Sequence, residues 1–334
     1  MQRSARCECS NQSLSALRGL RRLNRSEARL FRISRKAGKL AQIEQIGYSA
    51  RSSDGFRFPI YSLIIGKPAA LERSPVGLVA GVHGLETIGI RVLLDFLESI
   101  FDEPNRDVLQ ALLDGDMGIV SIPILNPGGV ALKSRANPAG VDLMRNSGKD
   151  GDTALPFFGG HRMSSKLPYF RGKSLQPESR ALFRFCSQRF SEARKGTILP
   201  VLDVHSGFGM KDSVWWPYAG KKMPSADHYL FERLSRILQT EGDGITYEPQ
   251  SQAYTVHADL WDRVYDDYRH SKKPAKLLPF TLEIGTWSDV KRNPKRLLSK
   301  RGLFNPPPEQ KALMIQRYRA FLSKFVLLSL LYGE

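Results

Sequence analysis

The chain has 334 residues, of which 41% are hydrophobic and 10% aromatic, the composition of a globular protein large enough for a sizeable core. Its 28 glycines and 20 prolines are spread along the sequence, which excludes collagen-like and low-complexity proteins. Three cysteines do not build a disulfide framework, and no apolar run approaches the roughly 20 residues that span a membrane. We therefore predict a cytoplasmic protein without a membrane span.

Positive charge is concentrated at the N-terminus. The net charge is +17, and residues 1–41 hold eleven Lys and Arg against two Glu, which gives 11 − 2 = +9. We predict that residues 1–45 form a basic tail, partly disordered or helical. Such an arm has the charge to contact nucleic acid or an anionic surface. Phe31 is its only aromatic residue, however, and this favours a solvated arm over a nucleic-acid contact.

Beyond the tail, short apolar runs alternate with helix-like segments. The predicted strands are 58–65, 76–82, 117–125, 198–204, 213–218 and 280–284. The predicted helices are 87–101, 107–113, 177–194, 226–240 and 309–331. This alternation predicts a single α/β catalytic domain over 46–334, with a mixed, mostly parallel twisted sheet flanked by helices.

Candidate metal ligands follow two of these strands. His83 and Glu86 lie three residues apart in HGLE, directly after the strand 76–82, and His205 follows the strand 198–204. Ligand-binding groups in open α/β sheets gather at the carboxyl ends of strands. Two neutral imidazoles and one carboxylate, with a fourth position left to water, are the usual ligands of a catalytic zinc ion. Asp203 is a candidate to orient the imidazole of His205 through its second nitrogen.

Two arginines and one glutamate are further candidates for binding or catalysis. Arg135 and Arg145 lie in a Gly-, Pro- and Asn-rich stretch, where a guanidinium can grip an oxyanion with two hydrogen bonds. Solvated arginines of a surface loop are the alternative. Glu283 stands alone in an apolar run, and a carboxylate there needs a partner or a catalytic reason to be ionised. A buried structural Glu–Arg pair is the alternative.

In order along the chain, five motifs resemble those of the zinc metallocarboxypeptidase family, in its carboxypeptidase A-like, bacterial cytoplasmic form. They are HGLE, NPGG, RANPAGVDLMRN, LDVHSGFG and TLEIG, which together span roughly residues 75–290. The resemblance implies a carboxypeptidase-like fold and one Zn²⁺ per chain, held by His83, Glu86 and His205.

The same resemblance implies roles for residues around the metal. Glu283 would be the general base and acid, and Arg135 would polarise the scissile carbonyl and stabilise the oxyanion. Arg145 would hold the free C-terminal carboxylate of a peptide. Tyr254 is placed like the mobile tyrosine of the family that closes over the substrate.

One departure from the family pattern affects the substrate. The family usually has Asn before the carboxylate-binding arginine, whereas this chain has Met144, whose thioether donates no hydrogen bond. Either Arg145 acts alone, or Asn146 or Asn137 substitutes, or the substrate is not an ordinary peptide C-terminus. The leading hypothesis is a metallocarboxypeptidase acting on peptides. The alternatives are a zinc amidohydrolase or deacylase for N-acyl amino acids or cell-wall peptides, and a non-catalytic protein that binds through its basic tail.

Overall fold

The computed structural model describes residues 2–102, 105–207, 209–298 and 300–332. Eight strands form one mixed sheet in the order β1-β2-β4-β3-β5-β8-β6-β7. Parallel pairings join β3 to β4 and β5, β5 to β8, and β6 to β7, while the β1–β2, β2–β4 and β6–β8 pairings are antiparallel. The strands are β1 (Ala41–Tyr48), β2 (Pro59–Ile65), β3 (Pro75–Ala80), β4 (Gly118–Ile122), β5 (Ile198–Gly207), β6 (Ser213–Trp216), β7 (Thr246–Pro249) and β8 (Lys276–Gly285).

The central strands follow from their composition. Every residue of β3, β4 and β5 is buried, as expected for parallel strands covered on both faces. All six predicted strands are present, and the predicted α/β class with its mostly parallel central sheet is confirmed. Two strands were not predicted, because β1 alternates Ile with Gln and Glu at an edge of the sheet and β7 has only four residues.

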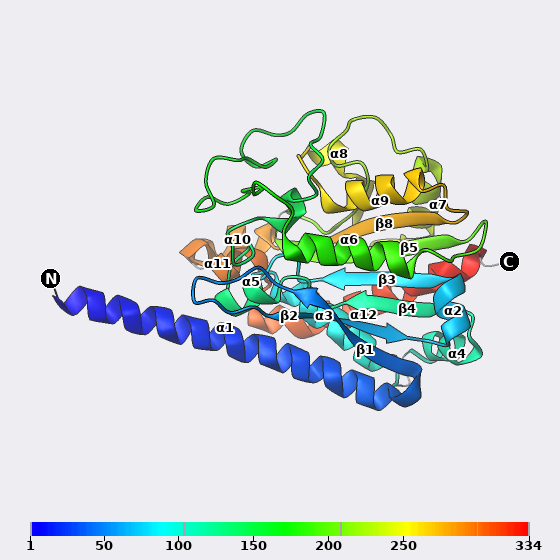
Figure 1. Ribbon diagram of the computed structural model, residues 1–334, viewed down its shortest axis with the longest axis horizontal. Helices are drawn as coiled ribbons and strands as arrows, with labels where there is room; N and C mark the ends of the chain where they lie inside the picture. Colours follow the sequence, from blue (N-terminus) through cyan, green and yellow to red (C-terminus); the bar gives the residue numbers. More distant parts are fainter. Residues whose placement is uncertain (1, 103–104, 208, 299, 333–334) are drawn as a thin grey trace.

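Helices cover both faces of the sheet (Figure 1). One apolar cluster packs α1, α3, α4, α7 and α12 on one face, and a second packs α6 and α9 on the other. The longer helices are α1 (Gln2–Ala37), α3 (Thr87–Ser99), α4 (Arg106–Asp114), α6 (Pro177–Arg189), α7 (His228–Leu238), α9 (Leu260–His270) and α12 (Lys311–Leu327). Shorter α-helices are α2 (Pro68–Arg73), α5 (Pro127–Leu132), α8 (Gln250–Ala253), α10 (Trp287–Arg292) and α11 (Lys300–Phe304). Among the described residues, no helix is both long and apolar enough to cross a membrane.

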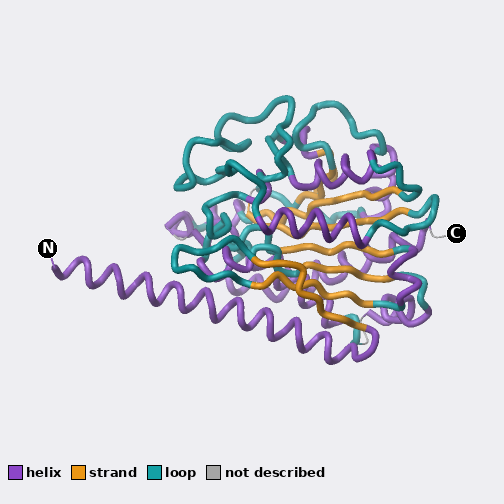
Figure 2. The backbone as a smooth tube through the Cα atoms, viewed as in Figure 1, coloured by secondary structure: helices purple, strands orange, loops and turns teal. Residues whose placement is uncertain are grey.

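The N-terminal segment is joined to the domain over much of its length. In α1, Leu23, Leu30 and Ile33 share one face and are at most 2% exposed in the core. The guanidinium Nε of Arg29 lies 2.6 Å from Glu98 of α3. The predicted tail boundary at residue 45 falls inside β1, which pairs with β2. The first part of α1 extends away from the sheet (Figures 1 and 2).

Helix α9 was not predicted, because its sequence LWDRVYDDYRH is rich in charge. Its apolar residues nevertheless recur on one face: Leu260, Trp261, Val264, Tyr265 and Tyr268 are all buried. The Asp259 side chain caps the helix by accepting from the backbone N–H groups of Trp261 and Asp262, at 2.8 and 3.1 Å.

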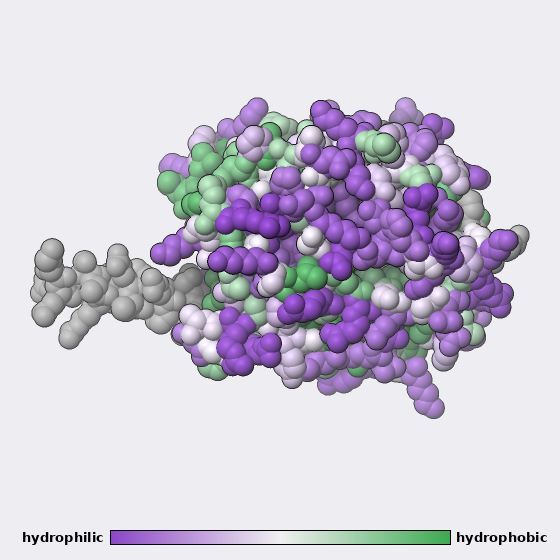
Figure 3. All heavy atoms as spheres, turned by 45° about the horizontal axis from the view of Figure 1, so that its top comes forward, coloured by the Kyte–Doolittle hydropathy of each residue, from purple (hydrophilic) through white to green (hydrophobic). Residues whose placement is uncertain are grey.

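Long loops gather at one end of the sheet, the end to which the arrowheads of β3 and β4 point (Figures 1 and 2). Residues 146–176, green in Figure 1, contribute the largest share of them. Hydrophobic side chains gather at this end of the surface (Figure 3). Within the loop 146–176, the exposed hydrophobic residues include Leu155, Phe158, Met163 and Leu167.

Candidate active site

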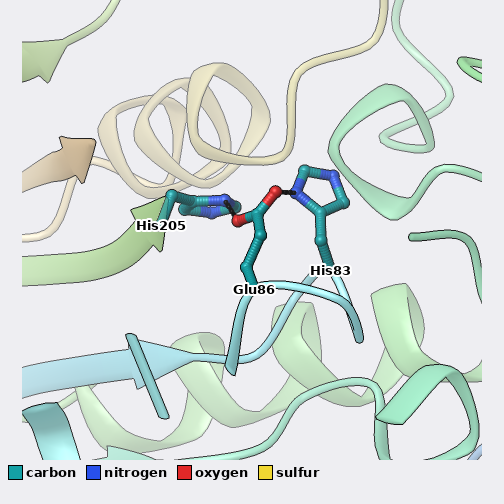
Figure 4. Close-up of side chains that lie close together, drawn as sticks. All are labelled: His83, Glu86 and His205. Carbon is teal, nitrogen blue, oxygen red and sulfur yellow. Dashed lines mark hydrogen bonds and ion pairs between the residues drawn. The ribbon is translucent and has the colours of Figure 1, made fainter. Parts of the chain in front are cut away.

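The structure brings the three predicted metal ligands together at the carboxyl end of the central strands (Figure 4). His83 and Glu86 lie in the turn between β3 and α3, and His205 lies near the end of the neighbouring strand β5. One nitrogen or oxygen ligand atom of each lies within 4.8 Å of the others, and all three side chains are buried. Segments 119 residues apart in sequence meet here because β3 and β5 pair in parallel.

A glycine without a Cβ and an asparagine side chain shape the turn that carries His83. A Cβ at Gly84 would lie 2.0 Å from the backbone of Gly129, so the HGLE and NPGG motifs meet backbone to backbone. The Asn126 amide donates to the carbonyl of Val82 at 3.1 Å, directly before His83, and accepts from the Gly129 N–H at 2.8 Å. The NPGG motif therefore braces the loop of the metal ligands.

The imidazoles of His83 and His205 each lie between Glu86 and an aspartate. His83 Nδ1 lies 2.7 Å from Glu86 Oε1, and His205 Nδ1 lies 3.0 Å from Glu86 Oε2. The opposite nitrogens face aspartates, since His83 Nε2 is 2.9 Å from Asp142 and His205 Nε2 is 2.8 Å from Asp203. The predicted contact between Asp203 and His205 is therefore present, and Asp203 also accepts from the Trp261 indole at 2.8 Å.

This donor set fits a divalent metal such as zinc. An imidazole that donates its Nε2–H to a carboxylate keeps a lone pair on Nδ1. Two such lone pairs and the Glu86 carboxylate converge, and they repel one another unless protons or a cation lie between them. His83 Nδ1 is buried, and it lies 2.7 Å from Glu86 Oε1 with no separate acceptor of its own among the described residues. Two histidines and one glutamate with room for water match a catalytic zinc site.

The charges of this cluster stabilise each other. Burial opposes ionisation of Glu86, but the charge of His83 and the hydrogen bond from His205 hold the pKa of Glu86 below its usual value. Burial likewise opposes ionisation of Asp142, and Arg135 with His83 lowers the pKa of Asp142 well below its usual value. Burial acts against the charge of His205, yet Asp203 raises the pKa of His205.

Arg135 connects the candidate metal ligands to a cavity. Its Nη1 lies 2.8 Å from Glu86 and its Nε 3.1 Å from Asp142. Its guanidinium carbon lies 5.4 Å from the ring centroid of Tyr169 and 5.7 Å from that of Phe304. The cavity has a volume of about 380 Å³, and its lining comprises Arg135, Arg145, Leu155, Phe158, Tyr169, Ala253, Tyr254 and Glu283.

Four of the predicted site residues therefore line one cavity. Glu283 of β8 is in register with His205 of β5, so both side chains leave the sheet on the same face of adjacent parallel strands. Burial raises the pKa of Tyr254, the charges of Arg145 and Arg135 oppose this rise, and that of Glu283 adds to it. Arg145 is 4% exposed, and its Nε has no hydrogen-bond partner among the described residues.

Asn146 is placed differently from its predicted role at the substrate. Its amide nitrogen donates to the carbonyls of Arg171 and Ser174, at 2.8 and 3.0 Å, and its oxygen accepts from the backbone of Gln176 and the hydroxyl of Ser179. Both amide hydrogens are used, so none is left for a substrate carboxylate. Asn146 instead joins the loop residues Arg171, Ser174 and Gln176 to the first turn of α6. Met144 is 5% exposed and packs in the core beneath α6 and α9.

Sequence reasoning missed several residues around the cavity. Asp142 stands in the GVDL stretch, and only the fold shows that it bonds to both His83 and Arg135. Tyr169, Phe158 and Leu155 come from the long loop 146–176, where no periodicity marks them.

The sequence matches the zinc carboxypeptidase family over residues 27–310, which makes this protein a metallopeptidase by family. The chain belongs to the zinc carboxypeptidases. Carboxypeptidase SOL1 of Arabidopsis thaliana is 27% identical over 136 residues, a match that spans 40% of this chain and 27% of that protein.

Solved structures share the fold at low sequence identity. Bovine thrombin-activatable fibrinolysis inhibitor, in complex with tick carboxypeptidase inhibitor, superposes with a TM-score of 0.67 at 18% identity, covering 92% of this chain and 96% of the other. A metallo-carboxypeptidase from Burkholderia cenocepacia gives a TM-score of 0.56 at 15% identity, with 90% and 68% covered. The sheet with its flanking helices is therefore a carboxypeptidase fold.

Proposed function

We propose that this protein is a zinc-dependent metallocarboxypeptidase that hydrolyses the C-terminal peptide bond of its substrate. The observation that supports this most strongly is the cavity in which Arg145, Arg135 and Glu283 meet beside the His–Glu–His group. A hydrolase for free C-termini needs a cation for the carboxylate, a base for water and a cation for the oxyanion. Each is available here within one cavity.

His83, Glu86 and His205 would hold the zinc ion. When bound, zinc supplies a Lewis acid that polarises a carbonyl and makes a water molecule more acidic. Glu283 takes a proton from the attacking water and passes it to the nitrogen of the departing residue. Because Glu283 is 9% exposed beside His205, little bulk water competes for that proton.

Arg135 and Arg145 bind two different negative charges, the oxyanion that forms in the reaction and the terminal carboxylate of the substrate. Arg135 faces the developing oxyanion, a type of stabilisation worth about 3–4 kcal/mol. Its bonds to Glu86 and Asp142 raise the pKa of Arg135 against the effect of burial, so it stays charged. Arg145 binds the terminal carboxylate, because its buried Nε has no partner of its own within the described part of the chain. Tyr254 closes over the substrate from the end of α8.

A second candidate is hydrolysis of N-acyl amino acids or cell-wall peptides by the same residues. The packing of Met144 in the core favours it, because the carboxylate site then relies on Arg145 without a neighbouring amide. Losing one donor to a charged group weakens binding by about 1.5–3 kcal/mol. Such a site would select substrates by contacts other than those with the carboxylate.

The test is mass spectrometry of a peptide pool with free or amidated C-termini, incubated with the zinc-loaded enzyme. We expect loss of single residues from free ends only, ended by a chelator and by Glu283→Gln. Removing a general base lowers the rate about 10²–10⁴-fold. Glu248→Gln in the edge strand β7, half-buried and outside the cavity, is the matched control and should keep full activity. Cleavage of acyl amino acids but not of peptides would refute the peptidase proposal.

A further inference from the structure

Glu86 begins α3 without capping it. The first N–H groups of a helix lack intrahelical partners, and a side chain at the N-cap position usually accepts from one of them. Glu86 occupies that position, yet it makes no capping hydrogen bond. Its two carboxylate oxygens are instead directed to His83 and His205 at 2.7 and 3.0 Å. The Glu86 carboxylate therefore faces the candidate metal site and does not cap the N-terminus of α3.

Asn305 supplies the missing cap from a segment 217 residues away. Its Oδ1 accepts from the backbone N–H of Ile88 at 2.9 Å and from the hydroxyl of Thr87 at 2.8 Å. Its Nδ2 donates to the carbonyl of Leu85 at 2.8 Å. Asn305 is 3% exposed, so water does not replace these bonds when they are lost. One side chain thereby fixes the residues on both sides of Glu86.

Phe304, the residue before Asn305, contacts the segment that carries His205. The carbonyl of Phe304 accepts from the Ser206 hydroxyl at 2.6 Å, next to His205. A Cβ at Gly207 would lie 2.5 Å from Phe304 Cδ1, so the two chains are in close contact there. Residues 304–305 therefore touch both the turn that carries Glu86, between β3 and α3, and the end of β5 that carries His205.

We propose that Asn305 is a positioning residue for the metal centre: it caps α3 in place of Glu86 and so leaves the Glu86 carboxylate free to bind the metal. The inference rests on the proposed zinc-dependent function. Without Asn305, the Ile88 N–H loses its acceptor, and the Glu86 carboxylate at the N-cap position then competes as an acceptor for the helix as well as for the metal.

The test measures zinc affinity of the folded protein by competition with a chromophoric chelator, together with the urea midpoint of unfolding. We expect Asn305→Ala to weaken zinc binding roughly 10- to 100-fold, the usual effect of losing a group that orients a metal ligand. Asn305→Asp keeps an acceptor oxygen for Ile88 and Thr87, and should retain most of the affinity. If Asn305→Ala does not fold, Asn305→Ser, whose shorter hydroxyl does not reach Ile88, should still weaken zinc binding.

Asn105→Ala is the matched control at the other end of α3. Asn105 is also buried; it donates to Ser99 at 2.6 Å and accepts from Ser323 of α12. Its loss should lower the unfolding midpoint and leave zinc affinity unchanged. An Asn305 variant with the same pattern, destabilised but with wild-type zinc affinity, would overturn the inference. A wild-type chain that binds no zinc would instead overturn the proposed function itself.

Discussion

The two carboxylate oxygens of Asp142 accept from different groups, and one isosteric substitution separates their contributions. Its Oδ1 accepts from His83 Nε2 at 2.9 Å and from the Met144 backbone N–H at 3.1 Å. Its Oδ2 accepts from Arg135 Nε at 3.1 Å. In Asp142→Asn, the amide oxygen remains where two donors converge, and the new NH₂ group faces the Arg135 N–H.

The expected changes in kcat and in zinc affinity follow from this geometry. Arg135 loses a charge-assisted hydrogen bond of about 1.5–3 kcal/mol and meets a donor in its place. If the guanidinium is displaced from the oxyanion, the barrier rises by about 3–4 kcal/mol, which lowers kcat roughly 10²–10³-fold. His83 keeps its acceptor, so zinc affinity should stay within about tenfold. Asp142→Ala removes both contacts and should also weaken zinc binding, by about 10- to 100-fold.

The assay combines chelator competition for zinc with kcat and KM on a peptide that has a free C-terminus. Asp203→Asn is the matched control: Asp203 Oδ2 accepts from both His205 and Trp261, while its Oδ1 has no partner among the described residues. Its new NH₂ group therefore opposes no donor, and kcat should change little. The reasoning is refuted if Asp142→Asn keeps the wild-type kcat or loses zinc as strongly as Asp142→Ala.

Substitutions at three further positions test other parts of the structure. Burial raises the pKa of Glu27 from 4.5 to about 7, so the folded protein holds more protons than the unfolded chain between these values and loses stability as pH rises through them. Urea unfolding should show Glu27→Gln equal to wild type near pH 4 and more stable at pH 8, and an equal offset at both would contradict this. Phe304→Leu should lower kcat about 2- to 30-fold, as expected if Arg135 acts in the reaction and loses a cation–π contact worth about 0.5–2 kcal/mol. Phe304→Tyr should retain the rate, and an equal loss in both variants would exclude the ring contact as the cause. Met144→Asn should lower the free energy of unfolding by about 1–3 kcal/mol, because it buries an amide in an apolar cluster, with KM unchanged. A tenfold lower KM would show instead that this position reaches the substrate.

The sequence determined the α/β class, the six strands it predicted and the three residues of the candidate metal site that the fold brings together. These signals are local: a continuous apolar run is typical of a buried parallel strand, and chemically distinctive residues directly follow two such runs. Asp203 was also accessible to sequence reasoning, because residues two apart in a strand share a face. The roles of Arg145, Glu283 and Tyr254 in the reaction stay predictions, although the fold gathers these residues in one cavity.

The role of the N-terminal segment depended on contacts far along the chain. Its positive charge indicated a solvated arm, whereas Leu23, Leu30 and Ile33 are buried and β1 extends the sheet. Composition does not show whether an amphipathic helix finds an apolar surface to cover, because that surface is assembled from α3 and α5. Contact of this segment with nucleic acid or an anionic surface stays a hypothesis.

Only the tertiary structure shows which polar side chains already have hydrogen-bond partners within the protein. Asn146 was a reasonable substrate ligand by position, yet the carbonyls of Arg171 and Ser174 use both of its amide hydrogens. Asn305 carried no signal in the sequence, because the helix that it caps begins 218 residues earlier. Residue type and spacing predict which groups are able to bind, whereas only the folded chain decides which of them are still free to do so, since each buried donor or acceptor bonds to whatever the fold places beside it.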